Sequence, residues 1–131
     1  MATAKSVSNF TINKGLTNEF ILTIKQNDTL LPMIIEYSDT FKLLLINLDT
    51  DQIESTIDMD NTKADGFIDV YDDANGQIRV TMNPTLTDRL EKERGPKADR
   101  YYLKPTYRMS IECNTMNNGN FVIKLKNISV D

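Results

Sequence analysis

Apolar and polar side chains alternate with a period of two along much of the chain, and two is the period of β-strands. The alternation is clearest in residues 20–24, 78–82, 107–113 and 121–125. In each stretch one set of side chains can face a core while the other faces water. The sequence therefore predicts half-buried strands rather than amphipathic helices.

Turn residues divide the chain into short strands. Asn75-Gly76 and Asn118-Gly119 suit the positive φ angles that tight hairpins need. After Leu125 the alternation slips by one residue, which predicts a bulge or bend near Asn127. This many short strands in 131 residues predict one all-β domain, a sandwich or a barrel. The predicted strands are 7–13, 18–26, 33–37, 41–48, 52–59, 66–71, 77–83, 105–115 and 120–130.

One segment reads as a helix. Thr85 or Thr87 can start it, and Gly95-Pro96 ends it, so we expect a short crossover helix near 85–94 between the two sheets. Two pairs of opposite charge at helical spacing support it, namely Asp88 with Lys92 and Arg89 with Glu93. At the other end of the chain, residues 1–9 are polar and are expected to form a loose N-terminal arm of the single domain 1–131.

The predicted strand 41–48 differs from the others because it is apolar on both faces. One face belongs to the core, and the other needs a cover that could be a helix, a loop or another subunit. Leu44 and Ile46 are the residues we assign to a protein interface on this strand.

Charge is unevenly distributed around a net value of −4. Residues 36–73 hold eleven acids and two bases, whereas residues 92–108 hold six bases and two acids. Such a chain can pair head to tail with copies of itself or dock on a charged partner. Alternatively, the two segments neutralise each other within one fold.

Few residues here suit catalysis or metal binding. The chain has no histidine, and Cys113 is its one cysteine, so the commonest general base and a disulfide are both absent. Asp69, Asp72, Asp73 and Asn75 crowd one turn, but their spacing does not match an EF-hand. A calcium site of other geometry stays open there. We otherwise predict no catalytic residue, no metal and no cofactor, with a small carboxylate enzyme as the weaker alternative.

The basic segment also carries aromatic side chains, which favour protein interfaces or single-stranded nucleic acid. The acidic stretch argues against a nucleic-acid partner. We therefore predict a protein interface formed by Arg94, Arg100, Tyr101 and Tyr102. No apolar run approaches the roughly 20 residues of a membrane span. The first six residues do not read as a secretory signal.

The layout is similar to immunoglobulin-like accessory domains of tailed-bacteriophage virions, and to the N-terminal domain of phage baseplate upper proteins in particular. The resemblance spans most of the chain. It is carried by FTINKG at 10–15, EFILTI at 19–24, GQIRV at 76–80, YRMSIE at 107–112, FVI at 121–123 and ISV at 128–130.

The resemblance implies an immunoglobulin-like antiparallel β-sandwich with a structural role. Such domains serve on the virion as decoration or adaptor modules of the head, neck or baseplate. Their partners are other capsid or tail proteins and copies of themselves, with neither membrane nor nucleic acid involved. A carbohydrate-binding β-sandwich is the alternative function, and it would use Tyr101 or Tyr102.

Overall fold

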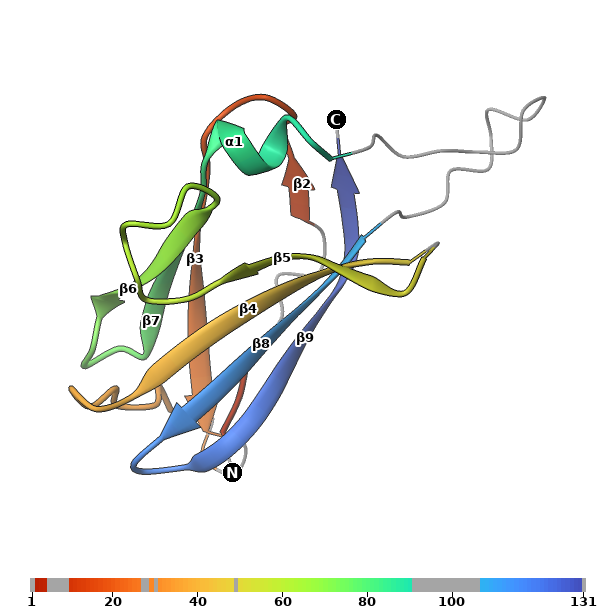
Figure 1. Cartoon of the computed structure of the whole chain (residues 1–131). Helices are drawn as coiled ribbons and strands as arrows, with labels where there is room; N and C mark the ends of the chain where they lie inside the picture. The colour runs from red at the N-terminus through yellow and green to blue at the C-terminus, as the bar shows by residue number, and fades with distance from the viewer. Residues whose placement is uncertain are drawn as a thin grey trace.

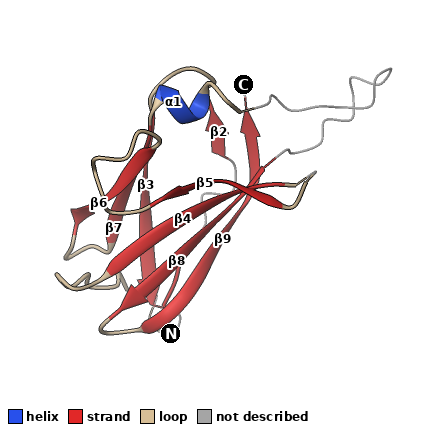
Figure 2. Ribbon diagram, viewed as in Figure 1, coloured by secondary structure: helices blue, strands red, loops and turns tan. Residues whose placement is uncertain are grey.

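Two β-sheets pack face to face and enclose one hydrophobic core in this computed structural model (Figures 1 and 2). The structure describes residues 2–4, 10–26, 29, 31–48, 50–90 and 107–130. The four-stranded sheet has the order β1 (Ala2–Ala4), β3 (Asn18–Gln26), β7 (Gln77–Met82) and β6 (Gly66–Asp72). The five-stranded sheet has the order β2 (Phe10–Ile12), β9 (Gly119–Val130), β8 (Tyr107–Thr115), β4 (Thr40–Asn47) and β5 (Gln52–Ile57).

The strand order is that of an immunoglobulin-like sandwich. In immunoglobulin lettering β1, β3, β7 and β6 are strands A, B, E and D, while β9, β8, β4 and β5 are G, F, C and C′. The pairs are antiparallel except β2 with β9, which is parallel. The predicted fold class, an immunoglobulin-like β-sandwich, is confirmed by this topology.

The core replaces the disulfide and tryptophan of antibody domains with aliphatic side chains. Tyr107 opens β8, and Met109 follows it by two residues, the spacing of the Tyr and Cys of an immunoglobulin F strand. Tyr107 is 2% exposed and Met109 is fully buried. The remaining large core residues are also aliphatic or aromatic, and the largest are Phe41, Ile12, Leu22, Ile24, Met33, Leu43, Leu45, Ile57, Ile68, Ile78 and Met82.

Most predicted strands agree with the structure to within one or two residues, and the turn assignments are confirmed. Gly76 and Gly119 have φ angles of 66° and 68°, as the two hairpins require. The bulge near Asn127 is also confirmed, because Tyr107 pairs with Ile128 whereas Met109 pairs with Leu125. Three residues of β8 therefore span four residues of β9.

Two strand predictions are wrong. Residues 33–37 alternate correctly, with Met33 and Ile35 buried, but they form a loop. Their amides bond to the end of β3 and to a turn: Met33 N donates to Ile24 O, and Ile35 N donates to Asp73 O. Conversely, Ala2–Ala4 of the expected loose arm pair with β3 as an edge strand. Residues 1 and 5–9 lie outside the described residues.

The helix is shorter than predicted. α1 spans Pro84–Thr87, so it begins one residue earlier than expected and ends after four residues. Proline at the first helical position fixes the starting φ. Arg89, two residues after the helix, forms an ion pair of 2.8 Å with Asp65, and the predicted partners Lys92 and Glu93 lie outside the described residues. The segment does connect the two sheets as predicted, and residues 91–94 lie outside the described part.

Candidate protein-binding face

The predicted interface residues of strand β4 lie on the outer face of the five-stranded sheet. Phe41, Leu43 and Leu45 of the same strand are buried in the core, so Leu44 and Ile46 point to the opposite side. Both are half-buried. The other predicted interface residues, Arg94, Arg100, Tyr101 and Tyr102, lie outside the described residues.

Strand pairing places a third aliphatic side chain beside them. The register of β4 and β5 shifts between Leu45 and Ile46, and this shift brings Ile53 directly opposite Ile46. Ile53 is 58% exposed. We call Leu44, Ile46 and Ile53 the apolar patch. Isolated exposed aliphatic residues are common, whereas a group joined by strand pairing marks a contact surface.

An arginine borders the apolar patch from the neighbouring strand. Arg108 of β8 pairs with Ile46 and, because Tyr107 and Met109 face the core, its side chain lies on the outer face. Its Nε atom is buried and has no hydrogen-bond partner among the residues that the structure describes. A buried N–H without an acceptor is costly to the isolated domain. Arginine is enriched at the energetic centre of protein interfaces.

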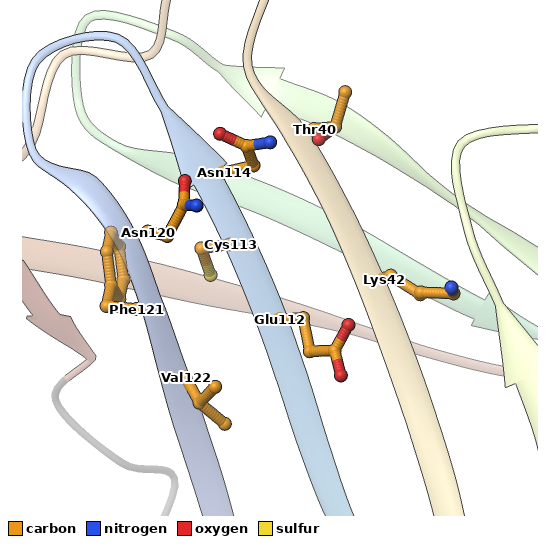
Figure 3. Close-up of a pocket in the computed structure, with 8 residues that line it drawn as sticks. All are labelled: Thr40, Lys42, Glu112, Cys113, Asn114, Asn120, Phe121 and Val122. Carbon is orange, nitrogen blue, oxygen red and sulfur yellow. The ribbon is translucent and has the colours of Figure 1, made fainter.

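The other end of the same face is polar and slightly hollowed. Figure 3 shows Thr40, Asn114 and Asn120 in a row across β4, β8 and β9. The next row across the same three strands is formed by Lys42, Glu112 and Val122. Cross-strand pairing sets these rows, since Thr40 is opposite Asn114 and Asn114 is opposite Asn120. Neutral amides and one charge of each sign can hold a polar ligand loosely, but they include no strong nucleophile or base.

Cys113 borders that hollow without being reactive. Its side chain is 2% exposed, and burial raises the pKa of the thiol from 9.0 to about 12. The thiolate is the nucleophilic form, so Cys113 is protonated and inert at neutral pH. Its Sγ lies 3.7 Å from the Ile111 carbonyl oxygen, to which it donates weakly.

Many acidic side chains are occupied in ion pairs and turns. Asp69 accepts two bonds from Arg79, of 3.0 and 2.6 Å, and Asp58 pairs with Lys63 at 2.7 Å. The hydrogen bond from Lys63 holds the pKa of Asp58 below its usual value. Such carboxylates stay ionised and do not suit general acid catalysis.

The turn considered for calcium is likewise engaged in its own bonds. Asp72 accepts from Asn75 Nδ2 at 2.7 Å, and Asp73 accepts from the Ala74 amide at 2.8 Å. Within the described residues, no three acidic or cysteine side chains are grouped closely enough to hold a metal ion. The same part of the chain contains no helix with the length and apolarity of a membrane span.

Sequence reasoning missed Ile53 and Arg108. The sequence of 52–57 does not predict that Ile53 faces outward. Its orientation depends on the register shift between β4 and β5, which the sequence of one strand does not reveal. Arg108 is one of the six bases of residues 92–108 and stands on the polar phase of its strand, but the sequence does not assign it to an interface. A signal was present, since an arginine on the polar phase of β8 must lie beside the outward residues of β4.

Comparison with known proteins supplies no family. No family model matches the chain, and no curated protein matches it. Among solved structures, the complex of Dpr1 IG1 with DIP-eta IG1 aligns with a TM-score of 0.43 and 9% identity, covering 100% of this chain and 96% of that one. The RIG-5 IG1 homodimer aligns with a TM-score of 0.43 and 12% identity, covering 99% and 97%. The class of this protein, an immunoglobulin-like β-sandwich, rests on its own strand order.

Proposed function

We propose that this protein is a non-enzymatic binding domain whose contact surface is the outer face of the five-stranded sheet. The observation that carries the proposal is the apolar patch bordered by the arginine side chain of Arg108. A protein partner would cover Ile53, complete the burial of Leu44 and Ile46, and meet the positive charge of Arg108. The inert thiol and the paired carboxylates support a binding role over catalysis.

We further propose that the partner belongs to a tailed-phage virion, with this domain as a decoration or adaptor on the head, neck or baseplate. Support comes from the resemblance of the strand motifs to virion accessory domains and from the unequal distribution of charge. Both features suit a protein used in many symmetric copies, where complementary charge fixes the register between neighbours.

Incorporation into particles tests both statements. A phage lacking the gene is complemented with the wild type, with Ile53→Lys, or with Ile21→Lys, and purified virions are quantified by mass spectrometry. Ile21 is the control because it is an exposed isoleucine, 38% accessible, on the other sheet. We expect the wild type and Ile21→Lys at one fixed ratio to the major capsid or tail protein, and Ile53→Lys at least about tenfold lower.

Each outcome has a defined meaning. Absence of the wild-type protein from particles would end the virion proposal. Equal incorporation of Ile53→Lys and Ile21→Lys would end the assignment of the contact face. Circular dichroism of both variants separates a binding defect from misfolding.

Carbohydrate binding is a second candidate because of the polar hollow in Figure 3. Asn114, Asn120 and Glu112 offer hydrogen-bond donors and acceptors on the outer face of β8 and β9. Amide and carboxylate groups suit sugar hydroxyls. A glycan array probed with the wild type and Asn114→Ala tests this role, and binding that depends on Asn114, or on Tyr101 or Tyr102, would favour it.

A further inference from the structure

A second hollow lies away from the contact face, between the β3–β4 loop and strand β6. It is lined by Ile35, Glu36, Tyr37, Met59, Val70 and Asp73, and we call it the Met59 hollow. Its floor is apolar, since Ile35 is 4% exposed and Val70 packs against the core. Two of its side chains are open to solvent: Tyr37 is fully exposed, and Met59 is 37% exposed.

A buried carboxylate fixes the loop that carries Tyr37. Asp39 is 2% exposed, and its Oδ2 accepts a bond of 2.9 Å from the Glu36 amide. Its Oδ1 accepts a bond of 2.8 Å from the amide of Met116, in the β8–β9 turn. Asn117 adds a bond of 3.2 Å to Glu36 Oε1. The exposed ring is therefore presented by a loop that is tied on both sides, which lowers the entropy cost of binding.

The surroundings of the Met59 hollow are negatively charged. Glu36 and Asp73 lie on its rim. Beyond Met59, a neighbouring hollow is lined by Asp58 and Asp60 together with Lys42. Asp58 is neutralised by Lys63, but the other carboxylates outnumber the single lysine. Apolar floor, exposed aromatic ring and acidic rim together fit a ligand segment that combines basic side chains with aromatic or aliphatic ones.

This chain itself contains such a segment. Residues 94–104 include four bases and one acid, and the tyrosines 101 and 102 are followed by a leucine. The segment connects Leu90, after α1, to Tyr107, at the start of β8. Tyr107 pairs with Asn47, whereas the β3–β4 loop precedes Thr40 at the other end of β4, so Tyr107 and the Met59 hollow lie at opposite ends of β4 (Figure 1).

The length of the chain favours docking between copies. Fully extended, the six steps back from Tyr107 to Tyr101 span about 21 Å. Strand β8 alone covers roughly 24 Å over the seven steps from Tyr107 to Asn114. The extended backbone is therefore about 3 Å shorter than the strand that it would have to follow to the hollow of its own copy, whereas a second copy has no such limit.

We propose that the Met59 hollow of one copy binds residues 94–104 of a second copy, giving a head-to-tail contact. Because the two surfaces differ, the contact is heterologous and can continue from copy to copy into a ring or row. The inference deepens the proposed function, since it assumes that the protein acts through protein contacts. It uses a different surface from the apolar patch.

Sedimentation of the full chain tests the proposal. At low salt we expect the weight-average mass of the wild type to rise with concentration above the 15.0 kDa monomer. At about 0.5 M NaCl the association should weaken, because exposed charges are screened. Met59→Lys should stay monomeric, and its matched control Met116→Lys, a 75% exposed methionine outside the hollow, should associate like the wild type. A synthetic peptide of residues 94–104 should compete, and a scrambled peptide should not.

Mixing two defective variants makes the test specific for head-to-tail contact. The first is Met59→Lys, and the second carries Arg100→Glu with Tyr101→Ala. Each should be monomeric alone, and the mixture should form dimers that do not grow, because one intact hollow meets one intact segment. A wild type that stays monomeric, or variants that fail to pair while the wild type associates, would overturn the proposal.

These outcomes are separable from those of the proposed function. Met59→Lys leaves the apolar patch intact, and Ile53→Lys leaves the Met59 hollow intact. If Ile53→Lys loses incorporation into virions but self-associates normally, the two surfaces act independently. Failure of self-association alone would remove only the inference about the Met59 hollow.

Discussion

The outer faces of the two sheets each carry an arginine, and they differ in whether its N–H groups have acceptors. On the four-stranded sheet, Arg79 donates two bonds to Asp69 across β6 and β7 and lies 5.6 Å from the centre of the Tyr71 ring. On the five-stranded sheet, Arg108 occupies a similar central position but leaves its Nε unsatisfied beside Ile46. The first face is complete in the isolated domain. The second leaves this donor without an acceptor among the described residues, and this difference supports the proposal that it is the contact face.

The ion pairs of the domain show which bases neutralise the acidic segment, residues 36–73. Three acids of the acidic segment, Asp58, Asp65 and Asp69, are neutralised within the domain by Lys63, Arg89 and Arg79. None of these bases belongs to residues 92–108. At these three positions the acidic segment is therefore neutralised by bases from outside the basic segment.

The largest expected effect is a loss of stability when the close approach of β6 to β7 at Gly66 is disturbed. Gly66 of β6 has a φ of +145°, and a Cβ there would lie 2.0 Å from the Thr81 carbonyl oxygen of β7. Gly66→Ala must push β6 away from β7, so we expect a loss of about 3 kcal/mol or more in unfolding free energy. Urea denaturation measures it.

The matched control is Gly119→Ala in the β8–β9 hairpin of the five-stranded sheet. Gly119 has a φ of +68°, but a Cβ there would meet no atom within 4 Å. Only the left-handed backbone is penalised, by about 1 kcal/mol. Equal losses for the two variants would show that the close approach of β6 to β7 is not what Gly66 provides.

Replacing Arg108 or Arg79 by methionine should have opposite effects on the stability of the domain and on its incorporation into virions. Arg108→Met removes an unsatisfied buried N–H while keeping the aliphatic stem, so we expect unchanged stability or a gain of up to about 1 kcal/mol. Its incorporation into virions should fall, because the positive charge beside the apolar patch is lost. Thermal melting and the incorporation assay together measure this split.

Arg79→Met on the other sheet should lower the melting temperature slightly, because Asp69 loses both of its bonds. Incorporation should be unchanged. If Arg108→Met destabilises the isolated domain as much as Arg79→Met does, Arg108 has a structural role and the contrast between the two faces fails.

The strands were predictable because local residues decide them. Asn18–Gln26 of β3 matches its predicted bounds, since Phe20, Leu22 and Ile24 alternate with mostly polar residues and turn residues flank the strand. The loop 33–37 was mispredicted because it alternates like a strand, and only the partners of its amides reveal the difference. No single-sequence pattern can show where such bonds go.

The candidate sites were predictable only in part. Leu44 and Ile46 could be found because their strand is apolar on both faces, which is a local property. Ile53 joined them through a register shift, and the Met59 hollow unites residues from three separate segments. Surfaces of this kind depend on pairing between distant parts of the chain, which the spacing of residues does not encode.

The smallest expected effect concerns the carboxylate that links the two sheets. Asp65 accepts bonds from Arg89, at 2.8 and 3.0 Å, and from Ser55 of β5, at 2.6 Å. The hydrogen bond from Arg89 lowers the pKa of Asp65. A lowered pKa means that the unfolded chain binds the proton more readily, so this stabilisation is present above about pH 4 and is lost as the pH falls further.

We expect the contribution to be less than about 1 kcal/mol, because the pair is partly exposed and screened by solvent. Urea midpoints of the wild type and Asp65→Asn should differ at pH 7, and the difference should shrink as the pH falls from about 5 to 3. The ion pair between Asp69 and Arg79 is present in both proteins, so acid-induced changes from that face cancel in the comparison. A difference that stays constant across this range would mean that Asp65 acts through its hydrogen bond to Ser55 rather than through its charge.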